Sequence, residues 1–451
     1  MLKRKIVIIG GSAAGPAAAA KAKRVNPANE VILYEQGPYI SIGTCELPYV
    51  LSGEIESVEK IIFFTPESFE AEKGAKVKIN HRVESIDKHN KKIFVRDLST
   101  QKVFEDNYDK LILCTGSRKK YHPNFPHGLE NVFYLKTVND AKRILNFISE
   151  NKISRSLLIG AGYTGLESLE FLKKISNEIY VADVSPYPLP GFDLEVQKIL
   201  LNEIQDRRIT FLGNVKDISP IVQNNRVVSV KIDKERIEID FVLITIGYEP
   251  NSSLASLAKL SINPDGSIRV DNKQRTSDDN IYAAGDCSSV AEFITNKNIW
   301  IPLATYAHNH GHIAGANAAG EPSSSYPVVR NMGFRFFDLS IAQVGLTQKE
   351  LSESKFNWAT VSAIGSSRIK VMPKGKKHFV KVYFNKENKK ILSASLIGGE
   401  DIVGKANLIS FAIKNNITID KFFNSEFLYT PSLSPFIESL SIISNKAREL
   451  K

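Results

Sequence analysis

The stretch GAGYTGLE, from Gly160 to Glu167, carries glycine at all three positions of the pattern GxGxxG and follows the apolar run SLLIG. A glycine-rich turn between a strand and a helix lets the backbone approach a pyrophosphate at the helix N-terminus. The next apolar run, EIYVAD, ends at Asp183, eighteen residues beyond Gly165, where a carboxylate accepts hydrogen bonds from a ribose. The sequence therefore predicts a nucleotide-binding βαβ unit that uses Gly160, Gly162, Gly165 and Asp183.

A second unit of the same kind opens the chain. The apolar residues Ile6 to Ile9 run into GGSAAG, Gly10 to Gly15, and the following strand VILYE ends at Glu35, twenty residues beyond Gly15. Ser12 replaces the middle glycine, so this copy matches the pattern less fully. Two copies, each with its own acidic residue, argue against the alternative that either glycine run is a turn without a ligand. The predicted contacts with this first nucleotide are Gly10, Gly11, Ser12, Ala13, Gly15 and Glu35.

The residues around Asp183 bear on which nucleotide the GAGYTG unit binds. A carboxylate at this position suits a free 2′-hydroxyl and repels a 2′-phosphate. No arginine occurs in the following run SPYPLPG. The sequence therefore favours NADH, with NADPH as the alternative.

Composition sets the general class. The chain has 451 residues, of which 43% are hydrophobic and 24% charged, as expected for a soluble protein of about three domains. Three cysteines argue against a disulfide scaffold and for a reducing, cytoplasmic compartment. The apolar stretch KIVIIG is too short to span a membrane. The net charge of +10 is spread along the chain, which favours a small polyanionic ligand over nucleic acid, and no metal site is predicted.

From about Ser325 the pattern changes. The runs FRFFDLSIAQVG, NWATVSAIG, HFVKVYFN and KILSASLIGG are typical of strands with partial alternation. They are followed by VGKANLISFAIKNN, which has apolar residues at helical spacing. The C-terminal third is therefore predicted to be an α+β unit on an antiparallel sheet.

Cys45 lies in YISIGTCELPYVLSG, Tyr39 to Gly53, and has no CxxC partner. Pro48 is tolerated in the first turn of a helix, so Cys45 is expected at a helix N-terminus, where the positive dipole end stabilises a thiolate. Glu46 opposes this effect by placing a negative charge beside the thiol. The alternative is that Cys45 is a small buried apolar residue. Cys114, in a buried strand, and Cys287 are interpreted as structural.

Two more motifs complete a recognisable order: YDKLILCTGS, Tyr108 to Ser117, and TSDDNIYAAGD, Thr276 to Asp286. Together with the two glycine runs they resemble the FAD- and NAD(P)-dependent pyridine nucleotide-disulfide oxidoreductases. The resemblance implies an α/β, glutathione-reductase-like fold with two Rossmann-like domains and a C-terminal α+β dimerisation domain. It implies an FAD-binding domain of residues 1–118 and 247–324, an NAD(P)-binding domain of residues 119–246, and an interface domain of residues 325–451. It places Thr115, Gly116, Asp286 and Ala304 against FAD.

The run around Cys45 is similar to the single-cysteine branch of that family, which includes coenzyme A-disulfide reductases, NADH peroxidases and NADH oxidases. Ser41, Cys45, Leu47, Pro48 and Tyr49 match its SFxxCxLPYxxG pattern, and Gly53 lies one position beyond the glycine of the pattern, whereas Ile42 and Glu46 depart from it. Peroxidases and oxidases generally carry a histidine at the position of Ala13. Because an acid–base imidazole is missing here, the disulfide and persulfide reductases are the closer match.

The same resemblance implies roles for further residues. Tyr429, in FLYTPSLSPF, would reach Cys45 of the partner subunit, and an interface tyrosine that only packs is the alternative. A second tyrosine expected near KVMPKG is replaced by Val371 and Met372. In the NAD domain, Tyr163 would be an aromatic gate over the flavin, Glu167 would face the nicotinamide pocket, and Gly247 would mark the return to the FAD domain. A coenzyme A substrate would contact Lys21, Arg24, Ser41, Thr44 and Lys73.

The expected protein is thus a homodimeric FAD enzyme that takes hydride from NADH and passes electrons through flavin to Cys45. Its substrate would be coenzyme A disulfide or a related small disulfide, persulfide or polysulfide. One alternative is an NADH oxidase or peroxidase that cycles Cys45 through sulfenic acid. The other is a flavin-binding redox sensor that turns over poorly.

Overall fold

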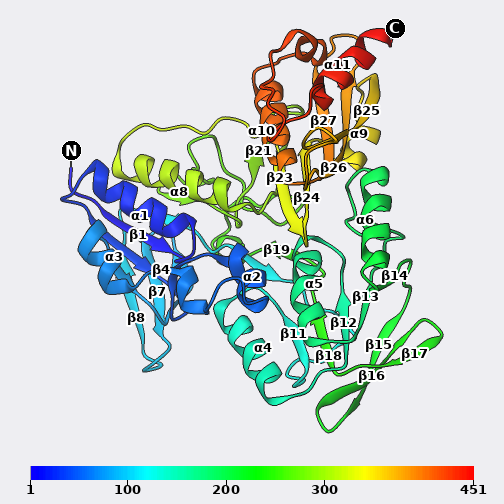
Figure 1. Cartoon of the computed structure of the whole chain (residues 1–451). Helices are drawn as coiled ribbons and strands as arrows, with labels where there is room; N and C mark the ends of the chain where they lie inside the picture. The colour runs from blue at the N-terminus through cyan, green and yellow to red at the C-terminus, as the bar shows by residue number, and fades with distance from the viewer. Residues whose placement is uncertain (1, 451) are drawn as a thin grey trace.

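A computed structural model describes residues 2–450, which form two Rossmann-like units and a C-terminal α+β unit (Figure 1). The first unit is built on a five-stranded parallel sheet of order β20-β9-β1-β2-β5. Alternation along β1 gives the sheet two apolar faces, because Ile6 and Ile8 pack towards the helices while Val7 and Ile9 pack towards a second sheet. Its strands are β1 (Lys5–Ile9), β2 (Glu30–Tyr34), β5 (Lys76–Lys78), β9 (Lys110–Leu113) and β20 (Ile281–Ala283).

Helices α1 and α8 cover one face of this sheet and pack closely on each other (Figure 1). A Cβ atom at Gly311 would lie 2.3 Å from the carbonyl oxygen of Ala14, and one at Gly315 would lie 2.3 Å from that of Ala18. The small residues of both helices therefore allow their backbones to approach. The elements around this sheet are α1 (Ala14–Val25), β3 (Ile40–Ile42), α2 (Leu47–Leu51), β4 (Ile62–Phe64), α3 (Pro66–Lys73), β6 (His81–Asp87), β7 (Lys92–Asp97), β8 (Val103–Asn107), α7 (Ser253–Leu257), β21 (Val290–Ala291), β22 (Asn298–Ile299) and α8 (Ala304–Ala319).

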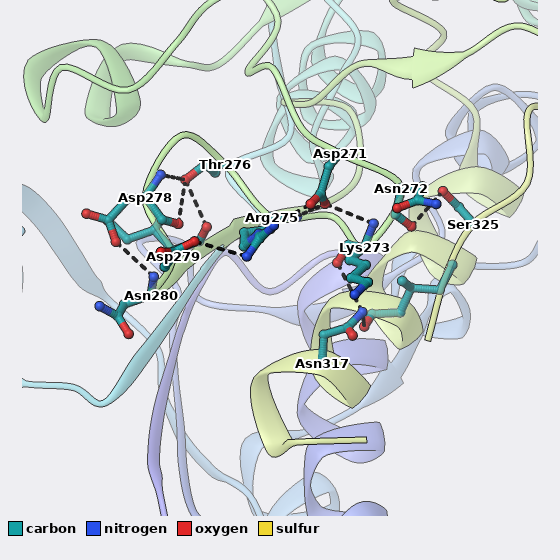
Figure 2. Close-up of polar contacts among 12 residues, drawn as sticks. Asp271, Asn272, Lys273, Arg275, Thr276, Asp278, Asp279, Asn280, Asn317 and Ser325 are labelled. Atoms are coloured by element: carbon teal, nitrogen blue, oxygen red, sulfur yellow. Dashed lines mark hydrogen bonds and ion pairs between the residues drawn. The ribbon is translucent and has the colours of Figure 1, made fainter. Parts of the chain in front are cut away.

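Hydrogen bonds and an ion pair hold the turn of residues 271–279, which precedes β20 of this sheet (Figure 2). The Asp271 carboxylate accepts hydrogen bonds of 2.9 Å from the backbone N–H groups of Lys273 and Arg275, and Arg275 reaches Asp279 at 3.0 Å. Asn317 of α8 donates to the carbonyl of Lys273 at 3.1 Å. The turn before β20 is therefore bonded to α8, the helix that begins at Ala304.

The second Rossmann-like unit has a parallel sheet of order β11-β18-β12-β13-β14. The two units are joined by the antiparallel pair β10 (Ser117–Lys119) and β19 (Tyr248–Pro250), and the predicted domain boundaries at residues 118 and 247 lie within and beside this pair. The other elements are β11 (Val132–Tyr134), α4 (Val138–Glu150), β12 (Arg155–Ile159), α5 (Tyr163–Ile175), β13 (Glu178–Ala182), α6 (Leu194–Asp206), β14 (Thr210–Leu212), β15 (Ile218–Gln223), β16 (Arg226–Ile232), β17 (Glu235–Glu238) and β18 (Phe241–Ile244).

The C-terminal unit is an antiparallel sheet of order β23-β24-β27-β26-β25, as the strand patterns predict. Helix α10, predicted from the apolar spacing after residue 402, packs on β24 and β27. Among the helices of residues 2–450, none is both long and apolar enough to cross a membrane. The elements are β23 (Asn331–Phe336), β24 (Leu339–Gly345), α9 (Gln348–Ser352), β25 (Trp358–Ser366), β26 (Lys377–Asn385), β27 (Ile391–Gly398), α10 (Asp401–Lys414) and α11 (Ser439–Glu449).

Candidate active site

One cavity of about 2270 Å³ is lined by all three units. Pockets for a single small ligand are typically about 300–1000 Å³, so this cavity has room for more than one ligand. Gly15, Gly165, Lys21 and Tyr429 are the predicted site residues that do not line it. The predicted residues that do are Gly10, Gly11, Ser12, Ala13, Arg24, Glu35, Ser41, Thr44, Cys45, Lys73, Thr115, Gly116, Gly160, Gly162, Tyr163, Glu167, Asp183, Gly247, Asp286 and Ala304.

The third glycine of each run serves packing. A Cβ atom at Gly15 would lie 1.8 Å from the carbonyl oxygen of Gly10, and one at Gly165 would lie 2.3 Å from that of Gly160. Each helix therefore contacts its own glycine turn too closely for any side chain. This explains why Gly15 and Gly165 match the pattern without lining the cavity.

The two acidic residues hold their glycine loops in the same way. Oε2 of Glu35 accepts a hydrogen bond from the Gly11 N–H at 2.6 Å, and Oδ2 of Asp183 accepts one from the Ala161 N–H at 2.7 Å. Burial raises the pKa of Glu35, whereas hydrogen bonds from the backbone N–H groups of Gly37 and Gly11 lower it. Both carboxylates line the cavity, where a ribose hydroxyl can reach them.

Three helices begin at this cavity without a side-chain cap. Within residues 2–450, no side chain caps α1 at Ala13, α5 at Gly162 or α8 at Leu303, and all three of these residues line the cavity. Helix N-termini with free N–H groups bind phosphate and other anionic groups. The loops at Gly10 and Gly160 thus fit two dinucleotides, with the start of α8 adding N–H groups beside the first.

All three cysteines lie in the described part of the chain, and only Cys45 among them is exposed. Its thiol lines the cavity. It belongs to a 3₁₀ turn (Thr44–Glu46) that precedes α2. The expected lowering of its pKa by a helix dipole does not prevail. Surrounding protein raises the pKa of Cys45 by desolvation, and the carboxylates of Glu46, Glu167 and Asp286 raise it further.

Lys136 is the cation that opposes these carboxylates, and sequence reasoning missed it. Its charge lowers the pKa of Cys45, while burial lowers the pKa of Lys136 itself. Its ammonium donates to Ser117 Oγ at 2.6 Å, lies 3.9 Å from Asp286 and sits 4.4 Å above the Tyr248 ring. Nothing in the run VFYLKTVND signals this position, because only the fold brings it to Asp286.

Glu167 and Tyr49 form a second polar pair in the site. The Tyr49 hydroxyl donates to Glu167 Oε1 at 2.9 Å. Burial raises the pKa of Glu167 to about 7, although the Tyr49 hydrogen bond and the Arg335 charge lower it. Glu167 is therefore a group that exchanges a proton near neutral pH.

The residues predicted to bind substrate are only partly brought together. Arg24, Ser41, Thr44 and Lys73 line the cavity, whereas Lys21 pairs with Glu321 at 2.7 Å outside it. The rings of His308 and His312 lie 4.7 Å apart on the same α8 face and also line the cavity. Their i, i+4 spacing in HNHGH is a signal that sequence reasoning did not use.

Tyr429 lies away from the cavity of its own chain. It is 45% exposed and packs edge-on against Phe436, with ring centroids 5.3 Å apart. Leu428, Phe436 and Ile437 are exposed as well, so the segment presents a row of apolar side chains to solvent. Its predicted reach into a partner subunit stays a prediction. Cys114 and Cys287 are buried, as expected of structural cysteines.

Two Rossmann-like units that share a cavity with an exposed thiol define a flavin- and pyridine-nucleotide-dependent oxidoreductase. Residues 4–311 match the pyridine nucleotide-disulphide oxidoreductases, and residues 332–440 match the dimerisation domain of the same family. The chain belongs to this family, and the resemblance and fold class predicted from the sequence are confirmed. The family implies that FAD and NAD(P)H bind here, in keeping with the two glycine loops.

Similar proteins within the family are named for different reactions. The chain is 32% identical to an NADH oxidase of Methanocaldococcus jannaschii, over 98% of both chains. It is 28% identical to a coenzyme A disulfide reductase of Staphylococcus aureus, covering 98% of this chain and 100% of the relative. The structure of a NAD-dependent persulfide reductase from A. fulgidus superposes with a TM-score of 0.94 at 28% identity, covering 99% of this chain and 83% of that one.

Proposed function

We propose that this protein uses NADH to reduce coenzyme A disulfide or a related small disulfide, persulfide or polysulfide, with Cys45 as its redox-active sulfur. The observation that carries this proposal is the exposed Cys45 thiol in the cavity where both glycine loops open. Relatives named as coenzyme A disulfide reductase and persulfide reductase support it. FAD, when bound at the Gly10 loop, supplies the transfer of two electrons from nicotinamide to sulfur.

The atoms and electrons of the reaction balance with one proton taken up. NADH, one proton and a disulfide RSSR give NAD⁺ and two thiols RSH. Cys45 attacks one sulfur of the substrate, releases the other as a thiolate and forms a mixed disulfide, which the two electrons then cleave. Glu167 is suited to hold the proton consumed in each turnover, because its pKa of about 7 leaves it partly protonated at neutral pH.

The finer assignments belong to the same proposal. Asp183 favours NADH over NADPH, because a carboxylate suits a free ribose 2′-hydroxyl and repels a 2′-phosphate. The phosphates of a coenzyme A substrate would be met by Arg24 and Lys73, with Ser41 and Thr44 beside the cysteine. The protein acts as a homodimer in which Tyr429 enters the partner's site, supported by the dimerisation-domain match and by the exposed apolar segment around Tyr429.

Cys45→Ser tests the proposal directly. The variant is expected to bind FAD normally and to lose NADH-dependent disulfide turnover by at least about a thousandfold, because a hydroxyl cannot form the mixed disulfide. Cys287→Ala, which removes a buried thiol, is the matched control and should keep its turnover. Full disulfide turnover by Cys45→Ser would refute the mechanism.

An NADH oxidase or peroxidase is the second candidate, favoured by the 32% identical relative. Ala13 is the feature against it, because no imidazole stands in the first glycine loop. Oxygen and peroxide consumption measured beside coenzyme A-disulfide reduction, in one NADH assay, separates the two. Flavin reduction too slow to support turnover with any acceptor would favour a redox sensor. Mass spectrometry of the intact protein under non-reducing conditions would identify any thiol carried on Cys45.

A further inference from the structure

The segment of residues 184–192, between β13 and α6, lines the second nucleotide's side of the cavity through Val184, Leu189 and Pro190. The Leu189 N–H donates to the carbonyl of Ala161 at 2.8 Å, so the segment is bonded to the glycine loop of its own unit. Leu189 has φ of +61°, a conformation that residues other than glycine seldom adopt. Such a conformation persists only where the surrounding structure holds it.

The segment's C-terminal end is held by a different structural unit. Asp193 caps α6, with Oδ1 accepting from the Glu195 N–H at 2.8 Å, and it is only 1% exposed. Its other carboxylate oxygen accepts a hydrogen bond from the hydroxyl of Tyr383, on strand β26 of the C-terminal unit. Lys381 of the same strand lies 3.1 Å from that oxygen and 2.9 Å from Glu195. Strand β26 thus supplies both the positive charge that pairs with the buried carboxylate and the hydroxyl that bonds its Oδ2, while α6 itself bonds its Oδ1.

Helix α6 is also fixed at its other end. Arg207, just beyond the helix, donates to Asp338 at 2.6 Å and lies 5.0 Å from the centre of the Phe337 ring. Asp338 and Phe337 belong to the turn between β23 and β24. Because both ends of α6 are tied to the C-terminal unit, the helix cannot carry the segment away from the cavity without breaking these contacts.

The segment also contacts the predicted aromatic gate. Phe192 is buried, and its ring centroid lies 5.9 Å from that of Tyr163. Tyr163 in turn lies 5.7 Å from Phe334 on β23, and its hydroxyl is 3.5 Å from Met332 Sδ. Tyr163 is therefore held between the segment and the C-terminal sheet, and a shift of Asp193 would alter its packing.

We propose that Tyr383 and Lys381 are positioning residues for the pyridine nucleotide, which hold Asp193 and thereby keep residues 184–192 in the conformation that lines the coenzyme side of the cavity. This inference goes beyond the proposed function, because it concerns the electron donor and is independent of which disulfide is reduced. It also gives the C-terminal unit a role in coenzyme binding within one chain.

The experiment compares Tyr383→Phe and Lys381→Met with Lys377→Met as the control. Lys377 lies four residues before Lys381 on β26 and is exposed. The oxidised holoenzyme is titrated with NAD⁺ by calorimetry, and amide hydrogen exchange of residues 184–193 is measured by mass spectrometry. A lost hydrogen bond to a charged group is expected to weaken NAD⁺ binding about tenfold and to speed exchange in this segment. KM for NADH should rise while kcat at saturating NADH stays within about twofold.

Two results would overturn the proposal. One is NAD⁺ affinity within twofold of wild type for Tyr383→Phe, together with unchanged exchange in residues 184–193. The other is an equal loss in Lys377→Met, which would mark a general effect of altering β26. Should Lys381→Met fail to fold, Tyr383→Phe decides alone, because it removes a single oxygen atom. Absence of NADH-dependent disulfide turnover in the wild-type enzyme, with NAD⁺ binding intact, would count against the proposed function and not against this inference.

Discussion

The hydroxyl of Tyr49 donates a hydrogen bond of 2.9 Å to Oε1 of Glu167. Tyr49 lies on α2, four residues after Cys45, and Glu167 lies on α5 of the second Rossmann-like unit. The bond therefore joins the two Rossmann-like units beside the Cys45 thiol. Arg335 of the C-terminal sheet lies 5.0 Å from the centre of the Tyr49 ring, so all three units meet at this point.

Glu167→Gln should change how stability depends on pH. The pKa of Glu167 is about 7 in the folded chain, above its ordinary value of 4.5, so the folded state binds this proton more tightly. The resulting stabilisation is fully present below about pH 4.5 and is lost as pH rises through 7. Between pH 5 and 8, the free energy of unfolding of wild type should fall by on the order of 2 kcal/mol relative to Glu167→Gln. Denaturant titrations across this range measure the difference, and parallel curves would contradict the prediction.

Tyr49→Phe should raise the pKa of Glu167 further. The hydroxyl stabilises the ionised carboxylate, so its removal favours the protonated form by about one pKa unit. Stopped-flow measurement of flavin reduction by NADH should show the corresponding ionisation at higher pH than in wild type. Tyr180→Phe is the control, because Tyr180 also donates to a glutamate, Glu178, at 3.0 Å. An unshifted profile in Tyr49→Phe would show that the pair does not govern this step.

Lys136→Met should make the Cys45 thiol less reactive. Lys136 is the charge that lowers the pKa of Cys45 against three carboxylates, so the variant should hold less thiolate at a given pH. The rate of alkylation by iodoacetamide at pH 8 is expected to fall about three- to tenfold. Lys142→Met, on the adjoining helix α4, should leave the rate unchanged. Equal rates for Lys136→Met and wild type would mean that this lysine does not act on the cysteine.

Asp183→Ala should weaken the preference for NADH. The carboxylate accepts hydrogen bonds from Ala161 and Ser185 and would repel a 2′-phosphate. Removing the like charge should lower the ratio of kcat/KM for NADH to that for NADPH by about ten- to a hundredfold. Steady-state assays with both nucleotides measure the ratio. A wild-type enzyme that already prefers NADPH would refute the assignment made from Asp183.

Much of the fold was predictable because it follows local patterns. Glu35 and Asp183 each come directly after an apolar strand at the spacing of a nucleotide-binding unit, and in the structure each accepts a hydrogen bond from its own glycine loop, which the sequence analysis did not predict. The C-terminal strands follow from apolar alternation. The sequence indicates opposing effects of the helix start and of Glu46 on the pKa of Cys45, but not that the fold adds Glu167 and Asp286 to the groups that raise it.

The sequence by itself determined the two nucleotide loops, the lone Cys45 and the antiparallel C-terminal sheet, because glycine requirements and apolar periodicity are properties of short stretches of chain. Only the tertiary structure decided that Lys136 opposes the carboxylates around Cys45, that Tyr49 bonds Glu167, and that Tyr383 holds Asp193. The members of these three pairs are separated by 91, 118 and 190 residues in the sequence. Electrostatic and hydrogen-bond contacts across such separations depend on how the three units pack together.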